Sequence, residues 1–438
     1  MTKGGGLLQL VAQGKQDVFL TGNPQVSWFK FVYRRYTNFA IESLPMYFDG
    51  AGDFGKRITC VVPRRGDLLG QLFLNIELPA IYLATGNGGA GCVCGPNSAA
   101  VATGDVASYV NSIGHALIKE IKVEIGEQEI DKQTGEWMEI WTNFTTPPGQ
   151  RAALNAMIGR AEGYYPPDGS FNTGPMKLTI PIQFWFCKNP GSYLPLIAMQ
   201  YHPVRITIQF RGLQELFMKT STTAACQQTV LPASISNCML YGDYVYLSEE
   251  ERRRFVSAAH EYLIEQIQYT PPISIPAGAT SATVPMEFNH PLREFFWYIR
   301  SNRMESYNEW FNFSNLAAIE SGYRRTDLLE TAVLQLDGYD RFDARDATYF
   351  RLVQPYQRHT VTPIDRYIYN YSLALWPEQA QPSGSLNASR IDNLVFQFTF
   401  PVETPVLPDP GAQTTRIYTR NHNILRVIEG FGGLLFTV

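Results

Sequence analysis

The histidines are the first candidates for metal or acid–base chemistry. None has a second histidine close enough in sequence to form a metal-binding pair. The six are His115, His202, His260, His290, His359 and His422. The stretch "HEYLI" at His260 lacks the second histidine that a zinc-protease helix carries. A cupin-type jelly roll would need a close pair on one strand. We therefore expect structural histidines, with no bound metal and no cofactor.

Other catalytic motifs give no support for an enzyme. The sequence contains no Gly-x-Ser-x-Gly elbow and no phosphate loop that ends in Gly-Lys-Ser or Gly-Lys-Thr. The glycines at 86–95 have neither the lysine nor the strand–loop–helix setting of such a loop. A glycosidase pair of carboxylates stays open, because its two members need not lie close in sequence. We predict that the chain is not an enzyme and has no catalytic residues.

Two further groups of residues bear on recognition and modification. Arg65-Gly66-Asp67 spells an integrin-type tripeptide, but a glycine before a strand is typical of a tight turn. Aromatic residues in 145–176 could contact sugars, so a jelly-roll adhesion or carbohydrate-binding protein is our alternative interpretation. Sequons occur at Asn143, Asn312, Asn370 and Asn387, and we take Asn143, Asn312 and Asn387 as candidate glycosylation positions.

The composition is that of a large globular chain with little charge. Of 438 residues, 45% are hydrophobic and only 17% are charged, and the net charge is −4. This length favours two domains, each able to bury a core. An acidic balance argues against a large nucleic-acid-binding face, which would be basic. We find no secretory signal and no apolar stretch long enough to span a bilayer. The six scattered cysteines are typical of reduced thiols in a cytosolic protein.

The elements that would position these residues are mostly strands. Apolar and polar residues alternate, as in half-buried strands, at 121–125, 177–186, 206–210 and 396–400. Helical patterns are few, and we predict helices at about 24–35, 131–144 and 248–259. Ser248 and Glu251 have the spacing of a capping box at the start of the last helix. With 35 Gly and 28 Pro, turn residues are dense, so the fold is predicted to be mostly β.

Signs of an internal duplication extend over both halves of the chain. Residues 39–44, FAIESL, resemble residues 262–267, YLIEQI. Each copy has about eight strands, the number in a jelly roll. We therefore predict two tandem eight-stranded jelly rolls with a few short helices. The predicted division is an N-terminal arm and helix at 1–36, a first jelly roll at 37–247, a linker helix at 248–259 and a second jelly roll at 260–438.

Three long segments between the predicted strands are rich in turn residues. We expect 80–112 and 145–176 to be exposed loops of the first copy, and 301–330 to be a long excursion of the second.

Several longer stretches, taken together, resemble one protein family. They are "GNPQVSWFKFVYRRYTNFAIES" at 22–43, "VEIGEQEIDK" at 123–132, "PLIAMQYHPVRI" at 195–206, "HEYLIEQIQ" at 260–268, "FNHP" at 288–291, "LDGYDRF" at 336–342, "QPSGSLNASRIDN" at 381–393 and "NILRVIEGFGGL" at 423–434. In this order they resemble the major capsid protein of nucleocytoplasmic large DNA viruses, most closely the chlorella-virus type.

The resemblance implies a structural function. Members of that family fold as two tandem jelly rolls, form homotrimers of pseudo-hexagonal outline and tile an icosahedral shell. The implied partners are neighbouring capsomers and minor capsid proteins beneath the shell, with no direct nucleic-acid contact and no membrane span. The implied location is the virion capsid, assembled in the host cytoplasm.

The opening aromatic stretch is our candidate for a partner contact. Asn23 and Pro24 favour a helix start, and Arg34 and Arg35 favour its end. One face of this helix would pack under the first jelly roll. The other face of the helix would be too apolar to remain exposed to solvent. We therefore expect it to lie at the capsomer base and to contact a partner. The candidate contact residues are Trp28, Lys30, Phe31, Arg34 and Arg35.

Overall fold

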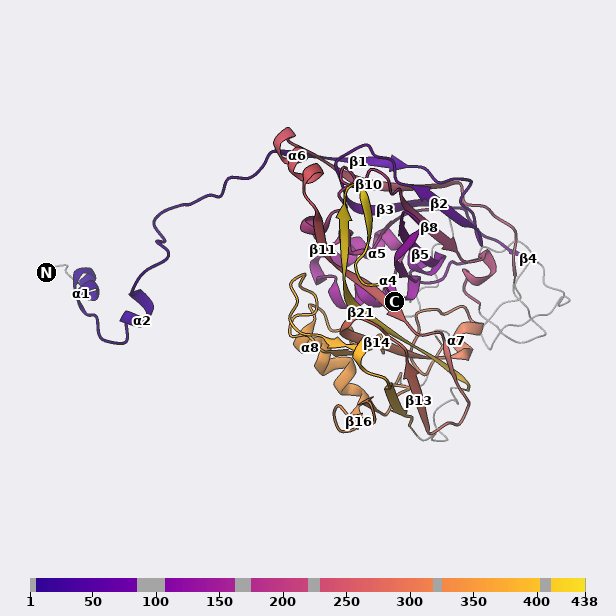
Figure 1. Ribbon diagram of the computed structural model, residues 1–438. Coiled ribbons are helices and arrows are strands. Elements are labelled where there is room, and N and C mark those ends of the chain that lie inside the picture. Colours follow the sequence, from indigo (N-terminus) through magenta and orange to yellow (C-terminus); the bar gives the residue numbers. More distant parts are fainter. Residues whose placement is uncertain are drawn as a thin grey trace. The chain divides into compact units, whose positions relative to one another are not determined.

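The computed structural model describes residues 5–84, 107–161, 175–219, 229–317, 325–401 and 411–437. The chain forms two compact units, Met1–Asn38 and Phe39–Val438. The first unit contains two short helices, α1 (Gly5–Val11) and α2 (Val18–Thr21), joined and followed by irregular chain (Figure 1).

The predicted helix at 24–35 is wrong. Residues 24–38 form no helix, and Asn23 has φ of +49°, a left-handed conformation rather than that of a helix N-cap. The side chains of Trp28, Phe29 and Phe31 are at least 90% exposed in the structure. An isolated helix of this length is marginal in water without an apolar face packed against a core. Capping signals therefore do not suffice to form it.

The second unit begins with a sandwich of two four-stranded antiparallel sheets. In order across the first sheet, the strands are β1 (Phe39–Met46), β10 (Asn237–Leu247), β3 (Leu68–Leu78) and β7 (Met176–Pro181). Those of the second sheet are β2 (Arg57–Val61), β8 (Val204–Phe210), β5 (Ile118–Ile125) and β6 (Gln128–Gln133). The short strands β4 (Leu83–Ala84) and β9 (Thr229–Val230) pair separately.

A second sandwich follows in the same unit. Its first sheet contains β11 (His260–Tyr269), β21 (Gln413–Ile428), β14 (Pro291–Ser301) and β18 (Tyr369–Ser372), extended by β12 (Ile273–Ile275), β19 (Leu386–Asn387) and β22 (Phe431–Leu434). Its second sheet contains β13 (Ser281–Met286), β20 (Leu394–Thr399), β15 (Thr331–Leu336) and β16 (Tyr339–Asp340), with β17 (Arg345–Asp346) paired to β15.

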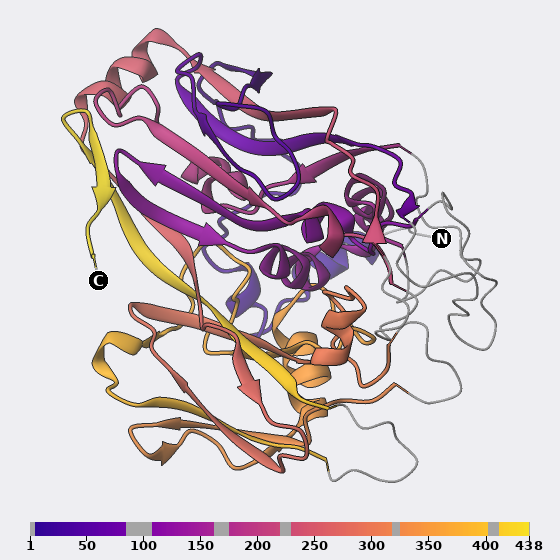
Figure 2. The same ribbon diagram turned by 90° about the vertical axis from the view of Figure 1, so that its right-hand side faces the viewer.

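Both sandwiches have the same strand order. If the eight main strands of each are numbered along the chain, one sheet reads 1-8-3-6 and the other 2-7-4-5, in both copies. This confirms the prediction of a mostly β fold with two tandem eight-stranded jelly rolls, and it is the arrangement that a duplication produces. Figure 2 shows the indigo and magenta strands of the first sandwich above the orange strands of the second, with the yellow strand β21 running past both.

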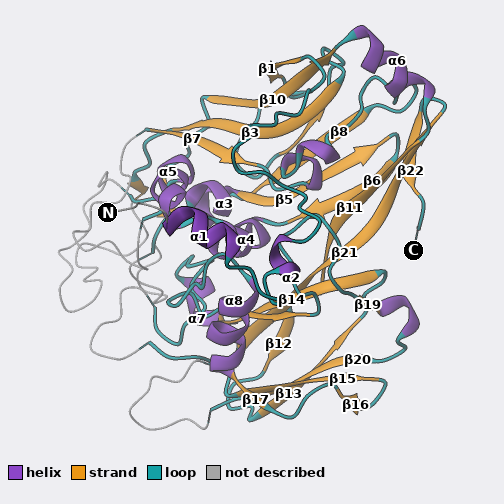
Figure 3. Ribbon diagram, turned by 90° about the vertical axis from the view of Figure 1, so that its left-hand side faces the viewer, coloured by secondary structure: helices purple, strands orange, loops and turns teal. Residues whose placement is uncertain are grey.

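The helices of the second unit are short. They are α3 (Ile113–Leu117), α4 (Gly135–Thr145), α5 (Pro148–Ile158), α6 (Glu249–Ser257), α7 (Asn302–Ser306) and α8 (Gln354–Arg358). One-turn 3₁₀ helices lie at Trp185–Cys187, Pro190–Ser192, Leu213–Glu215 and Ala388–Arg390, and a π-helical turn at Tyr349–Val353. Figure 3 shows α3, α4 and α5 gathered beside β5 and β7.

Several predicted boundaries need correction. The helix expected at 131–144 begins only at Gly135, because 128–133 pairs with β5 as a strand. The strand expected at 177–186 ends at Pro181, and the buried side chains of Phe184 and Phe186 follow in and next to a 3₁₀ turn. The capping box at Ser248 does not form, since the Ser248 side chain makes no capping hydrogen bond.

The expected loops are only partly within the described residues. Most of 80–112 lies outside them, as do 162–174 and 318–324. The exposed loop expected at 145–176 is wrong for 148–158, which form α5 and bury Leu154 and Ile158. Within the excursion expected at 301–330, residues 310–317 are buried.

One large apolar core joins the two sandwiches. It contains the inner side chains of the first sandwich, such as Ile121 and Val123, together with Phe296, Tyr298 and Tyr418 from the second. A smaller core fills the second sandwich alone. Because the larger core is continuous across the junction, residues 39–438 behave as one compact body.

Candidate functional site

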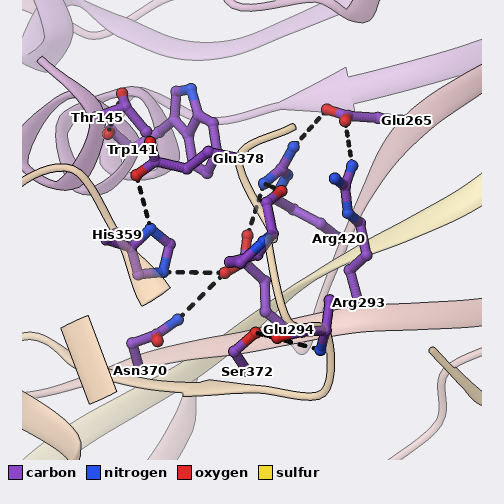
Figure 4. Close-up of polar contacts among 12 residues, drawn as sticks. Trp141, Thr145, Glu265, Arg293, Glu294, His359, Asn370, Ser372, Glu378 and Arg420 are labelled. Atoms are coloured by element: carbon purple, nitrogen blue, oxygen red, sulfur yellow. Dashed lines mark hydrogen bonds and ion pairs between the residues drawn. The ribbon is translucent and has the colours of Figure 1, made fainter. Parts of the chain in front are cut away.

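A group of buried charges lies at the junction of the two sandwiches, around Glu294 on β14 (Figure 4). The Glu294 carboxylate contacts His359 Nε2 at 3.1 Å and Arg420 Nη1 at 2.6 Å. The other ring nitrogen of His359, Nδ1, lies 3.0 Å from Glu378 Oε1. The Asn370 amide donates a further hydrogen bond of 3.4 Å to Glu294.

The pairing keeps these groups ionised despite their burial. Burial by itself would lower the pKa of His359, but Glu294 and Glu378 outweigh it and raise the pKa to about 9. Burial would raise the pKa of Glu294, but His359 and Arg420 outweigh it and lower the pKa to about 2. The imidazolium and the carboxylate are therefore both charged at neutral pH.

A third carboxylate in the same cluster reaches the first sandwich. Glu265 on β11 forms ion pairs with Arg293 and Arg420, and at 3.3 Å with Lys188 of the first sandwich. Trp141 on α4 covers this group, with the Arg420 guanidinium 3.9 Å and the Lys188 ammonium 4.4 Å from its ring centroid. Cations over an indole face are attracted to it, so the cluster fastens the two sandwiches together.

Glu136 at the start of α4 makes a second bridge across the junction. Its carboxylate accepts hydrogen bonds from Arg416 at 2.6 Å and from the Tyr418 hydroxyl at 3.0 Å, both on β21. Arg211 of the first sandwich contacts the same carboxylate at 3.4 Å, and Arg300 of the second at 3.7 Å. Breaking one member of such a buried group leaves an uncompensated charge, which is strongly destabilising.

The C-terminal strand β22 adds a third connection. The Gly432 carbonyl lies 2.8 Å from His202 Nδ1, and the Leu434 amide donates to Gln128 Oε1 at 3.0 Å. The rings of Tyr201 and Phe431 lie 5.0 Å apart. Since β22 pairs with β21 of the second sandwich, it holds the turns of the first sandwich against the second.

The carboxylates of these clusters are paired with cations of the protein itself. Glu294, Glu265 and Glu136 each contact an arginine. Within the described part of the chain, no three His, Cys, Asp or Glu side chains are placed to hold a metal ion. His115, a buried residue of α3, lies 2.7 Å from Glu139, which also pairs with Arg160 at 2.6 Å. These contacts give the histidine a partner within the protein.

The tripeptide Arg65-Gly66-Asp67 is likewise structural. Asp67 is buried, and its Oδ2 atom accepts hydrogen bonds from the Leu247 amide at 2.8 Å and from Arg252 Nη2 at 3.0 Å. A Cβ atom on Gly66 would lie 2.9 Å from Cβ of Tyr244. The glycine is thus required by close packing, and the aspartate is not available to a receptor.

The candidate partner-contact residues lie close together in one irregular segment. Trp28, Lys30, Phe31, Arg34 and Arg35 are all exposed in the structure. Since no helix forms there, the two faces that we predicted do not exist as such. The concentration of exposed aromatic and basic side chains remains.

The sequons differ sharply in exposure. Asn143 and Asn312 are buried, with their amides donating to Glu139 O at 2.8 Å and to Leu316 O at 2.8 Å. A glycan on either side chain would require the surrounding core to open. Asn143 and Asn312 are therefore not suited to glycosylation in the folded chain. Asn370 is also buried, whereas Asn387 is exposed at the end of β19.

Sequence reasoning missed the buried charges of β14. In the run "PLREFFWYIRS" of β14, Arg293, Glu294 and Arg300 interrupt an otherwise apolar strand. All three are buried. Charged residues inside an apolar strand at the centre of a sheet are the signal that could have identified them, because such charges need partners. No described helix has the length and apolar character needed to cross a membrane.

Comparison with known proteins gives matches over nearly the whole chain. The family model for the N-terminus of the major capsid protein matches residues 27–248, and the model for the major capsid protein of large eukaryotic DNA viruses matches residues 251–433. The major capsid protein of Pyramimonas orientalis virus is 35% identical, over 99% of this chain and 100% of its own length. Those of Phaeocystis pouchetii virus and Paramecium bursaria Chlorella virus 1 are 34% and 32% identical, each over 99% of both chains.

Solved structures agree in fold. PBCV-1 VP54, fitted into a reconstruction of the virophage Sputnik, has a TM-score of 0.74 at 27% identity, over 94% of this chain and 100% of its own. The Faustovirus major capsid protein has a TM-score of 0.73 at 13% identity, over 95% and 94% of the two chains, which indicates a shared fold. Since family models match both halves and relatives match almost from end to end, the chain belongs to the major capsid proteins of large eukaryotic DNA viruses and has a structural role in the capsid.

Proposed function

We propose that the chain forms homotrimers of pseudo-hexagonal outline that tile an icosahedral shell. The observation that carries this proposal is the repeated strand order, 1-8-3-6 and 2-7-4-5, in two sandwiches joined by a continuous core. Three such chains related by a threefold axis would place six similar sandwiches around a ring, which approximates a hexagon. The chain would then act without catalysis and without contacting nucleic acid, in the virion capsid after assembly in the host cytoplasm.

The same proposal divides the chain into four parts. An arm at 1–36 precedes a jelly roll at 37–247, a linker helix at 248–259 and a second jelly roll at 260–438. Trimers would contact neighbouring capsomers at their sides and minor capsid proteins beneath the shell. The alternative of an adhesion or carbohydrate-binding protein finds no support in the relatives described above.

The mass of the purified particle tests the trimer. We expect light scattering to give three times the chain mass, with no dissociation on dilution to micromolar concentration. An obligate interface of this kind should bury more than about 2,000 Å² in total. A monomer at that concentration would refute the proposal.

The exposed aromatic segment is our candidate for the partner contact at the capsomer base. Trp28 and Phe31 expose nearly their whole side chains, and Lys30, Arg34 and Arg35 place cations beside them. Exposed apolar groups of this size mark interaction sites. We expect the double variant Trp28→Ser, Phe31→Ser to form trimers of unchanged thermal stability but to impair shell assembly.

A matched control removes an exposed aromatic residue elsewhere. Tyr339 on β16 is 80% exposed, so Tyr339→Ser tests the general loss of an exposed ring. Normal shells from the double variant would refute the contact. Loss of the trimer in that variant would show instead that the segment belongs to the trimer itself.

A further inference from the structure

A small pocket lies where the 3₁₀ turns between 185 and 192 of the first sandwich meet strands β11 and β21 of the second. Its volume is about 240 Å³. Trp185 and Lys188 line it from the first sandwich, and Glu265 and His422 from the second. Pockets for drug-sized ligands begin at about 300 Å³. This pocket therefore suits a ligand no larger than a monosaccharide.

His422 on β21 is the residue of the lining that points to a ligand. It is only 7% exposed, and neither of its ring nitrogens has a hydrogen-bond partner in the described part of the structure. Burial and the nearby guanidinium of Arg293 lower its pKa to about 4, so the ring is neutral at pH 7. A neutral imidazole has one N–H donor and one nitrogen acceptor. Because buried groups without partners cost free energy, a ligand that both donates and accepts would stabilise this ring.

Other groups of the lining are mainly hydrogen-bond donors. The indole nitrogen of Trp185 is buried and has no partner among the described residues. Lys188 has three N–H bonds, and its nitrogen lies 3.3 Å from Glu265 Oε2. Asn189 and Ser192 add an amide and a hydroxyl group to the lining. A ligand with several oxygen acceptors would match these donors.

The charges of the lining disfavour an ionic ligand. Glu265 pairs with two arginines, and Glu378, which also lines the pocket, pairs with His359 (Figure 4). An anionic ligand would lie beside these two carboxylates, and a cationic ligand would lie beside Lys188. Since the protein already supplies each carboxylate with a cation, a neutral ligand is favoured.

We propose that this pocket binds a neutral ligand with several adjacent hydroxyl groups, either a monosaccharide or a small polyol. A hydroxyl group both donates and accepts, so hydroxyls satisfy the two ring nitrogens of His422. Leu263 and Ala380 supply apolar surface for the carbon skeleton of the ligand. Because the lining comes from both sandwiches, the bound ligand bridges them and stabilises the folded chain by mass action. This binding adds to the structural role and does not depend on the trimer.

Saturation-transfer NMR on the purified full-length protein tests the pocket, with glucose and glycerol as probes. We expect saturable binding of glucose in the millimolar range and competition between the two probes. Tighter binding of glucose would identify a sugar ring as the preferred ligand, and tighter binding of glycerol a free polyol. Acetate and ethylammonium at equal concentration should not displace either probe. Displacement by one of these ions, or no saturable binding of either probe at tens of millimolar, would overturn the proposal.

A blocking variant locates the binding within the pocket. Ala380 lines the pocket and is exposed, so Ala380→Trp should intrude into the pocket without disturbing the core. We expect it to weaken binding of the preferred probe by about tenfold or more, since the ligand then loses its contacts with the lining. The matched control is Ala258→Trp, at an exposed alanine directly after α6, which should leave the affinity unchanged.

A second variant, His422→Leu, tests the role of the imidazole. Leucine has a similar volume but no ring nitrogens, so binding should weaken by about tenfold or more. The melting temperature in ligand-free buffer should not fall, because the ring nitrogens make no hydrogen bond with the described protein. A fall would show that the protein itself uses these nitrogens, which contradicts the proposal. If Ala380→Trp and His422→Leu both keep the original affinity, the probes bind elsewhere and the assignment is wrong.

Discussion

The His359 ion pairs predict that the folded chain loses stability as the pH rises. A rise of the His359 pKa from 6.5 to about 9 corresponds to about 3 kcal/mol of stability. Because the folded-state pKa is raised, this stability is fully present below pH 6.5 and is lost as the pH rises through 9. The carboxylates that face the ring, Glu294 and Glu378, both have lowered pKa values and stay ionised throughout this window.

The variant His359→Gln isolates this contribution. Glutamine keeps one amide donor for a carboxylate but carries no charge at any pH. Lys188 also titrates in this cluster, with a pKa that burial lowers to about 8, but it is present in both proteins. The difference in unfolding free energy between wild type and variant therefore reports on the charge of His359.

Denaturant unfolding followed by tryptophan fluorescence gives this difference at each pH. We expect the wild type to exceed the variant by about 3 kcal/mol more at pH 6 than at pH 10. His290→Gln is the control, since the pKa of His290 is lowered by burial and the ring stays neutral above pH 6.5. A stability difference that is constant with pH, or one that grows as the pH rises, would refute the assigned charge of His359.

Four further outcomes are expected from the structure. Phe296→Ala should cost about 3–5 kcal/mol in denaturant unfolding, because it empties a fully buried aromatic position in the junction core. Glu136→Gln should lower stability by about 3–5 kcal/mol, since it leaves Arg416 and its neighbours uncompensated. By contrast, Glu250→Gln on exposed α6 should change it by less than about 1 kcal/mol. If glycans are attached to the folded protein, peptide mass spectrometry of virions should find them at Asn387 rather than at the buried sequons.

The strands were predictable because one physical rule governs them locally. Alternation at 121–125 and 206–210 places one side of each strand in the core, and the structure buries Ile121, Val123, Ile206 and Ile208. The duplication followed from comparing such strands, since each copy must bury the same faces. These features depend on short stretches of sequence, so a single sequence suffices for them.

The predictions that were wrong or missing concern structure that depends on residues distant in the sequence. The caps at 23–24 favour a helix, yet nothing within the segment stabilises one. The prolines and glycines around α5 predict a loop there, although Pro148 at its start and Gly159 after its end are usual helix boundaries. Arg293 and Glu294 were passed over because the partners that neutralise their charges lie up to 126 residues away in sequence.

The two sandwiches share a strand order, but their surroundings differ. Helices α4 and α5 accompany only the first, and strands β12, β19 and β22 extend only the second. In a threefold ring of such chains, the outline would be nearly sixfold while the surface chemistry would repeat only three times. If one trimer were rotated by 60°, the edges formed by the first sandwich would lie where those of the second had been, and the reverse. Each tile in a lattice would therefore have two distinguishable orientations, and a neighbour that recognises one kind of edge could select between them.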